Sequence, residues 1–429
     1  MANRYWVGGT GTWNTTSTTN WSASSGGSSG ASVPTSADSV FFDQNSTYTV
    51  TMTGALNCLD ITVSTGAVTF ATGTTPTLAV AGSIAITAGT TTWNSTGTIT
   101  LSSTSSVTIT SGGTTFNASI TISGAGGTKT LQDNLTLGTT NTLTLTSGTL
   151  ALSSYTLTAG LFSSSNANAR TLNFGTGKIV LTSATTSTVW TTATVTSLTV
   201  SGTPLVECQG GGSAVTKTIN TGALSEANSI SFSLLETTGT ATYAFTASNV
   251  VKNLIINGLQ TLSNIAISIY GSFTHSTSNG TTTFTAGTNA WTFAATSGSY
   301  TITPVSATTY DFPWTFNGVG GTWQILANLT LGSGRAFTLT NGTFDFNSFT
   351  VSGPTSGVTI VTGSVSIANT GGGGSLSTAL PFTHTSGTLT LGVNAATTST
   401  SGYTFTAGTL ALSGSGAIAS SSGVAANGT

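Results

Sequence analysis

Charge is what this sequence has least of. Charged residues make up 4% of its 429 residues, against about a quarter in ordinary soluble domains. Seven basic and nine acidic side chains leave a formal net charge of −2. This balance gives no electrostatic basis for binding nucleic acid or an anionic membrane surface. Because few charges keep copies of the chain apart, the composition favours a packed, multi-copy assembly.

Cysteine and long apolar runs are scarce as well. The two cysteines, Cys58 and Cys208, lie far apart and lack metal-ligand spacing. We interpret them as buried free thiols, and the sequence leaves a disulfide between them open. No apolar run approaches the roughly 18 residues of a membrane-spanning helix. The first residues, MANRYWVGGTGTWN, contain no apolar core of a signal peptide, so we expect no Sec-type export signal.

Chemistry-bearing residues are few and scattered. Glycoside hydrolysis needs two carboxylates about 5–9 Å apart, and Glu207 and Glu226, 19 residues apart, have a spacing close to one coil of the repeat. We interpret all the carboxylates as isolated turn or surface groups, with Asp345 on an outward row. The full set is Asp38, Asp43, Asp60, Asp133, Asp311, Asp345, Glu207, Glu226 and Glu236.

The remaining candidates for catalysis or metal binding are equally isolated. His275 and His384 have no neighbouring Cys or His. Asp38 and Asp43 could hold Ca²⁺ through turn oxygens, although turn capping is the favoured interpretation. We therefore predict that the protein is not an enzyme, and that it has no catalytic, cofactor-binding or metal-binding residues.

What the chain does have is a repeat rich in Thr, Ser and Gly. Gly124–Thr158 and Gly318–Ser352 align without a gap at an offset of 194 residues, and NLTLG recurs at 134–138 and 328–332. Apolar residues alternate with Thr, which is typical of a strand with one buried face, and Gly stands at the breaks, where corners need positive φ. We predict an all-β fold, a parallel β-helix or β-solenoid of short coils of about 20–25 residues.

The chain divides into three predicted regions. Residues 1–50 carry three tryptophans, Trp6, Trp13 and Trp21, which predict an aromatic N-terminal cap over the first coil, or alternatively a docking module. Residues 51–240 and 241–429 are the first and second halves of the solenoid, related by the internal repeat. Five further tryptophans are interpreted as core filling rather than sugar-stacking platforms, namely Trp93, Trp190, Trp291, Trp314 and Trp323.

The N-terminal region resembles a module found in two groups of proteins. The pattern consists of Trp6, Gly8, Gly9, Gly11, Trp13, Asn20 and Trp21, followed by Pro34, Asp38, Val40 and Phe42. It is similar to the start of β-helical passenger domains of bacterial autotransporters and haemagglutinin-like proteins, and to that of phage virion proteins. The segment Leu145–Ser183 also resembles repeats of tail-associated phage proteins.

This resemblance implies a structural phage virion protein, tail-associated or a fibre, that acts in particle assembly or in multivalent host-surface attachment. Its expected partners are other virion proteins and copies of itself, with a trimer as one form, and host-surface glycans are candidate ligands. Trp6, Trp13, Trp21, Asp38 and Phe42 are the candidate docking or capping residues. The expected location is the virion.

Two other functions stay open. The first alternative is a bacterial cell-surface adhesin or extracellular filament subunit, placed at the cell surface or secreted. The second is a binder of ice or another crystal surface, because outward rows of Thr-x-Thr can form flat hydroxyl arrays. Along the chain, however, these rows are interrupted by Ser, Asn and Ala.

Overall fold

The fold is all-β, as the alternating pattern predicted. The structure is a computed structural model that describes residues 1–87, 90–246, 249–332 and 334–353. Beyond these it describes 358–360, 364–368, 370, 375–378, 382–384, 387–391, 396–399, 403–412, 417–420 and 424–426. Within these ranges the helical structure is one short turn, η1 (Glu226–Asn228), and no helix is long and apolar enough to cross a membrane. Contacts divide the chain into unit 1, Met1–Gly210, and unit 2, Gly211–Thr429.

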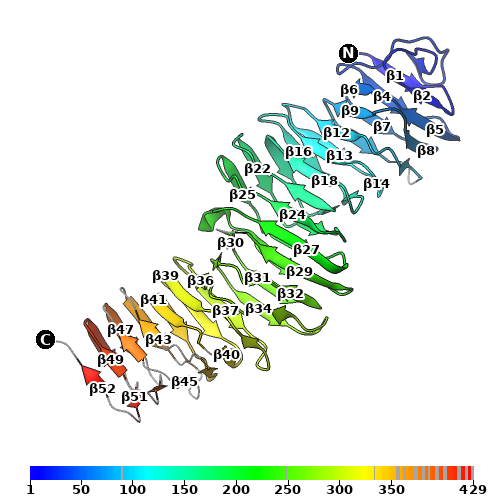
Figure 1. The fold of residues 1–429 in the computed structure, drawn as a ribbon. Helices are drawn as coiled ribbons and strands as arrows, with labels where there is room; N and C mark the ends of the chain where they lie inside the picture. Colours follow the sequence, from blue (N-terminus) through cyan, green and yellow to red (C-terminus); the bar gives the residue numbers. More distant parts are fainter. Residues whose placement is uncertain are drawn as a thin grey trace. The chain divides into compact units, whose positions relative to one another are not determined.

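Unit 1 is a parallel β-solenoid whose strands from β4 onward visit three sheets in turn (Figure 1). The first sheet contains β1 (Asn3–Trp6), β3 (Trp21–Ser22), β4 (Ser39–Phe42), β7 (Ile61–Val63), β10 (Ile84–Ile86), β13 (Val107–Thr110), β16 (Thr128–Leu131), β19 (Gly148–Ala151), β22 (Arg170–Asn173) and β25 (Leu198–Ser201). The second contains β2 (Gly11–Trp13), β5 (Thr47–Met52), β8 (Ala67–Thr72), β11 (Thr92–Trp93), β14 (Thr115–Phe116), β17 (Leu135–Leu137), β20 (Thr156–Ala159), β23 (Lys178–Leu181) and β26 (Leu205–Cys208). The third contains β6 (Ala55–Cys58), β9 (Thr77–Val80), β12 (Thr98–Leu101), β15 (Ile120–Ile122), β18 (Thr142–Leu145), β21 (Leu161–Ser163) and β24 (Ser187–Thr191).

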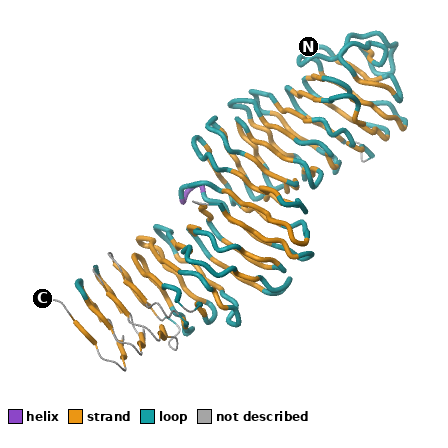
Figure 2. The backbone as a smooth tube through the Cα atoms, in the orientation of Figure 1, coloured by secondary structure: helices purple, strands orange, loops and turns teal. Residues whose placement is uncertain are grey.

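Unit 2 is built from the same short parallel strands separated by loops (Figure 2). One column contains β28 (Ser231–Leu234), β31 (Leu254–Asn257), β34 (Phe273–Ser276), β37 (Ser299–Thr303), β44 (Ser364–Ala368), β47 (Thr388–Leu391) and β50 (Thr409–Leu412). A second contains β30 (Asn249–Val251), β33 (Ile267–Ile269), β36 (Trp291–Phe293), β43 (Val358–Ile360), β46 (Phe382–His384), β49 (Tyr403–Phe405) and β52 (Val424–Ala426). Two strands, β39 (Trp314–Ile325) and β41 (Phe337–Asp345), run through a corner and pair in both columns.

The remaining strands of unit 2 form two shorter ladders. One contains β27 (Ser213–Asn220), β29 (Thr240–Phe245), β32 (Gln260–Leu262) and β35 (Thr283–Phe284). The other contains β38 (Thr309–Tyr310), β40 (Leu329–Leu331), β42 (Val351–Ser352), β45 (Ser375–Thr378), β48 (Ala396–Ser399) and β51 (Ala417–Ser420).

The core of each unit follows from the alternation of residues within these strands. In β17 and β20 the leucines point inward and the neighbouring threonines point outward. Leu135 of β17 lies in register with Leu157 of β20. Each fully buried Leu, Ile or Phe side chain contributes about 1.5–3 kcal/mol. Because like residues stack on like, every coil buries its apolar row against its neighbours.

At one corner of the internal repeat, both copies have glycine for a steric reason. Gly148 begins β19 at a φ of 78°, and a Cβ there would lie 2.1 Å from the carbonyl oxygen of Gly124, one coil earlier. In the second copy Gly342 has a φ of 91°, and its Cβ would lie 2.4 Å from the carbonyl oxygen of Gly318. Both copies therefore place glycine over glycine at an inner corner, where no side chain fits.

Candidate functional site

Three tryptophans and a phenylalanine close the N-terminal end of the core in unit 1. We call Trp6, Trp13, Trp21 and Phe42 the aromatic lid. All four are at most 1% exposed. Trp21 meets Trp6 and Trp13 edge to face, with ring centroids 5.2 and 5.4 Å apart, and it lies 6.1 Å from Phe42. Edge-to-face pairs of this kind add about 0.5–1.5 kcal/mol each beyond the burial of their area.

The other residues of the N-terminal pattern position the lid. Asn20 covers Gly8 and Gly11 so closely that a Cβ on Gly8 would lie 2.3 Å from the Asn20 Oδ1, and its Nδ2 donates to the Thr12 carbonyl oxygen at 2.9 Å. Asp38 is 6% exposed. Its carboxylate accepts hydrogen bonds from Ala2 N at 3.0 Å and from Thr35 Oγ1 at 2.7 Å. These bonds, with that from Thr35 N, hold the pKa of Asp38 below its ordinary value against the opposing effect of burial.

The lid residues are thus packed inside, and other residues form the surface around them. A shallow depression of about 340 Å³ is lined by Asn14, Pro34 and Ala55, among others. On the outer face of the first sheet, Tyr5 stacks on Phe41 with centroids 4.9 Å apart, and both rings are partly exposed. Docking through this end would therefore use these outer residues, and the indoles would support them from below.

Columns of hydroxyl side chains run along two of the three outer faces of unit 1. On the second sheet of unit 1, six threonines on consecutive coils share one outward column without interruption, namely Thr49, Thr69, Thr92, Thr115, Thr136 and Thr158. On the third sheet the column contains Thr100, Thr121, Thr144, Ser163 and Thr191. The rows that are interrupted along the chain become continuous across coils, where neighbouring hydroxyls lie about 4.8 Å apart.

Unit 2 carries an equivalent column. Ser268, Thr292, Thr315 and Thr338 follow one another in register on β33, β36, β39 and β41. The register continues through Thr359 of β43 to Thr383 and Thr404. A regular row of hydroxyl side chains is therefore present in both units.

Several of the few charges are turned inward. Arg170 is 2% exposed, and its guanidinium donates to carbonyl oxygens of two loops, including Ser164 O at 2.7 Å, Asn168 O at 3.0 Å and Thr196 O at 2.8 Å. Lys129 is fully buried, and its Nζ donates to the carbonyl oxygens of Ser103 and Gly124. Burial lowers the pKa of both side chains, because desolvation disfavours the charged form.

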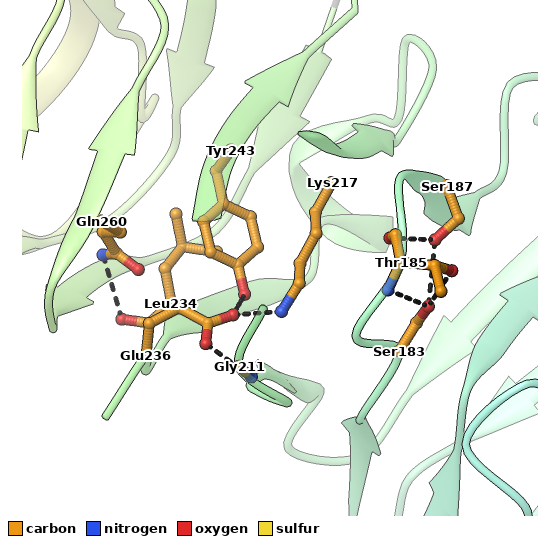
Figure 3. Close-up of polar contacts among 9 residues, drawn as sticks. All are labelled: Ser183, Thr185, Ser187, Gly211, Lys217, Leu234, Glu236, Tyr243 and Gln260. Carbon is orange, nitrogen blue, oxygen red and sulfur yellow. Dashed lines mark hydrogen bonds and ion pairs between the residues drawn. The ribbon is translucent and has the colours of Figure 1, made fainter. Parts of the chain in front are cut away.

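A second buried group in unit 2 contains a cation, an anion and a phenol. Lys217, Glu236 and Tyr243 are each 0% exposed. The Lys217 Nζ pairs with Glu236 Oε1. Tyr243 donates to the same oxygen at 2.6 Å, and Gly211 N donates to Oε2 at 2.9 Å. Figure 3 shows the three donors converging on the carboxylate.

Glu207 and Glu226, the two carboxylates with coil spacing, each have a polar partner of their own. Glu207 of unit 1 pairs with Lys178 at 2.9 Å, and Glu226 of unit 2 accepts from Thr296 Oγ1 at 2.6 Å. Backbone N–H groups or an arginine bind three more carboxylates. Asp60 accepts from Ser83 N, Asp133 accepts from Ser111 N and Gly112 N, and Asp311 pairs with Arg335. Among the described residues, no three acidic, His or Cys side chains gather as metal ligands.

Two carboxylates are not where the sequence placed them. Asp345 was expected on an outward row, but it is 3% exposed and accepts from Gln324 and Thr370. The expectation fails because β41 ends at Asp345, where the alternation stops and Phe344, Asp345 and Phe346 are buried in succession. Glu236 was interpreted as a turn or surface group and is instead ion-paired in the interior.

Both histidines lie in the core. His275 Nδ1 is 2.8 Å from the Tyr310 hydroxyl, and its ring meets Phe284 edge to face at 5.1 Å. Burial lowers the pKa of His275 from 6.5 to about 4. His384 is 1% exposed and packs on Phe405. Among the described residues, neither ring bonds to a serine or a carboxylate.

Two further expectations are confirmed. Cys58 and Cys208 are buried thiols that are not joined in a disulfide, and burial raises the pKa of the Cys58 thiol. The five tryptophans interpreted as core filling are at most 2% exposed. No protein-family model, curated protein or solved structure matches the chain.

Proposed function

We propose that the protein is a structural component of a bacteriophage virion, tail-associated or part of a fibre. It acts in particle assembly or in multivalent attachment to a host surface. The observation that carries this proposal is the set of hydroxyl columns on its outer faces, which repeat from coil to coil. A contact made on one coil recurs on the next, so weak individual contacts add to a strong total.

The inward turning of charge supports the same role. The chain has only seven lysine and arginine residues. Because Lys129, Arg170 and Lys217 are buried, few positive charges reach its surface. Surfaces without charge repulsion associate readily. Partners are then copies of this chain or other virion proteins, and host glycans could stack on the ring pair of Tyr5 and Phe41.

The phage origin is supported by the N-terminal pattern. Its residues are those that build the aromatic lid and the turn of Asp38, so the resemblance rests on a packed substructure rather than on composition. The alternative, a bacterial adhesin or filament subunit, shares the solenoid and the hydroxyl columns.

Immunogold electron microscopy of the source sample separates these cases. Antibody to this chain should place gold on phage tails or heads. Gold on cells or on free fibres would replace the proposal with the adhesin or filament alternative. Absence of the chain from purified particles in an immunoblot would refute the virion role directly.

The unbroken threonine columns favour a second candidate, a binder of ice or another regular crystal surface. Such a role needs many hydroxyls at one repeat, which the column through Thr92 and Thr115 provides. Purified protein should then show thermal hysteresis, and Thr115→Lys in the middle of the column should remove it. No hysteresis in the wild-type protein would eliminate this candidate.

A further inference from the structure

We propose that Lys217 and Glu236 of unit 2 join through an isopeptide bond that the protein forms by itself. The two side chains meet in an interior that solvent does not reach, since both are 0% exposed. They come from different elements, Lys217 from β27 and Glu236 from the segment after β28. The bond would therefore fasten two consecutive passes of the chain.

The surroundings favour condensation over a permanent ion pair. A buried ion pair is costly to desolvate and adds little stability. Moving one proton from the Lys217 Nζ to the Glu236 carboxylate gives an uncharged amine and an uncharged acid. These are the two species that react to form an amide, and a dry site excludes the water that would reverse the reaction.

The hydrogen bonds assign a role to each carboxyl oxygen. Tyr243 donates to Oε1 at 2.6 Å, on the oxygen that Lys217 also contacts. Gly211 N donates to Oε2 at 2.9 Å. When Nζ attacks the carboxyl carbon, Gly211 N–H stabilises the negative charge on Oε2, as a backbone donor does in an oxyanion hole.

The step balances without any other reactant. A bond forms between Nζ and the carboxyl carbon, and the bond from that carbon to Oε1 breaks. Oε1 leaves as water with the two protons that Nζ gives up. Oε2 remains as the amide carbonyl, still bonded to Gly211 N–H, and the new amide N–H can donate to the Tyr243 oxygen.

Another lysine–glutamate pair of the chain serves as the contrast. Lys178 Nζ and Glu207 Oε2 of unit 1 also form an ion pair, 2.9 Å apart, but the two side chains are 39% and 17% exposed. Water reaches that pair and would reverse an amide bond formed there, so it should stay uncrosslinked.

Mass spectrometry tests the proposal on the full-length protein. The mass of the wild-type chain should fall short of its sequence mass by one water molecule. After denaturation, trypsin should fail to cleave behind Lys217 and should release residues 179–252 as one internally linked peptide. Fragmentation of that peptide should place the loss between Lys217 and Glu236.

Two variants make the outcome decisive. Lys217→Arg keeps the charge and a trypsin site but cannot form the link, so it should show the full mass and complete cleavage at residue 217. Tyr243→Phe should slow the appearance of the linked species while circular dichroism confirms the fold. A wild-type chain with full mass and complete cleavage after Lys217, or a water loss that maps to another residue, would overturn the proposal.

Discussion

Replacing Gly148 by alanine tests whether close stacking of coils at the inner corner limits stability. Gly148 and Gly126 have nearly the same backbone, with φ values of 78° and 76°. A Cβ at Gly148 would lie 2.1 Å from the Gly124 carbonyl oxygen, whereas a Cβ at Gly126 would have nothing within 4 Å. Gly126→Ala is therefore a matched control that shares the backbone strain but lacks the collision.

The magnitudes follow from these two terms. An L-residue held at positive φ costs about 1–2 kcal/mol, which both variants incur. Displacing packed backbone adds about 1–3 kcal/mol, which only Gly148→Ala incurs. The variants should therefore differ by about 1–3 kcal/mol in local stability, or about 5–150-fold in the population of the opened coil.

Hydrogen exchange is the suitable assay, because stacked repeats need not unfold in a single step. Exchange of the β16 and β19 amides reports the opening of this region by itself. Gly148→Ala should lose more protection than Gly126→Ala, and Gly342→Ala should repeat the effect at β41. Equal protection in Gly148→Ala and Gly126→Ala would show that backbone strain alone matters and would refute the stacking argument.

Three other predictions concern the lid and the buried polar groups. Trp21→Ala should cost about 3–5 kcal/mol, seen as lost exchange protection in β1 and β4. Arg170→Lys should cost at least about 2 kcal/mol, since one ammonium cannot satisfy the carbonyl oxygens that the guanidinium holds, and thermal melting would measure it. His275, with a folded pKa of about 4 against 6.5 when exposed, stays neutral in the fold while the unfolded chain takes up a proton. Stability should fall by up to about 3 kcal/mol as pH drops from 6.5 to 4, and melting curves of His275→Phe should lack this part of the pH dependence.

Much of the fold could be predicted because each strand repeats one simple rule. Alternation of Leu with Thr in segments such as Thr142–Leu145 identifies an inner and an outer face, and glycine marks the corners. The gapless repeat also fixed which positions correspond in the two copies. Gly148 and Gly342 correspond because the same close backbone contact requires glycine at both. The lid was expected because three indoles in so short a stretch need a buried place.

The buried charges were missed although a signal for them existed. Lys217 shares the parity of Ile219 in its strand, and Glu236 follows Phe232 and Leu234 at alternate positions. Parity alone therefore points them inward. The opposite expectation came from treating charged residues as surface residues, which overlooks the neutralising partner that the next coil supplies.

The hydroxyl columns lay beyond sequence reasoning for a different reason. Their continuity depends on which residue of one coil faces which residue of the next. Loops of different length intervene, so that hydrogen-bonded partners on neighbouring coils are 22 residues apart in one place and 29 in another. The period of two fails at Asp345 for a local reason, because β41 ends there and a turn through Asn347 and Ser348 follows.

The crossed indoles of the aromatic lid also give the molecule an optical signature. Trp21 lies at 83° to Trp6 and at 76° to Trp13, with centroids little more than 5 Å apart. Neighbouring chromophores in such an arrangement share their excited states, and this produces a paired positive and negative band in ultraviolet circular dichroism. These paired bands therefore report whether the indoles of the lid are packed, separately from the β-sheet signal of the coils.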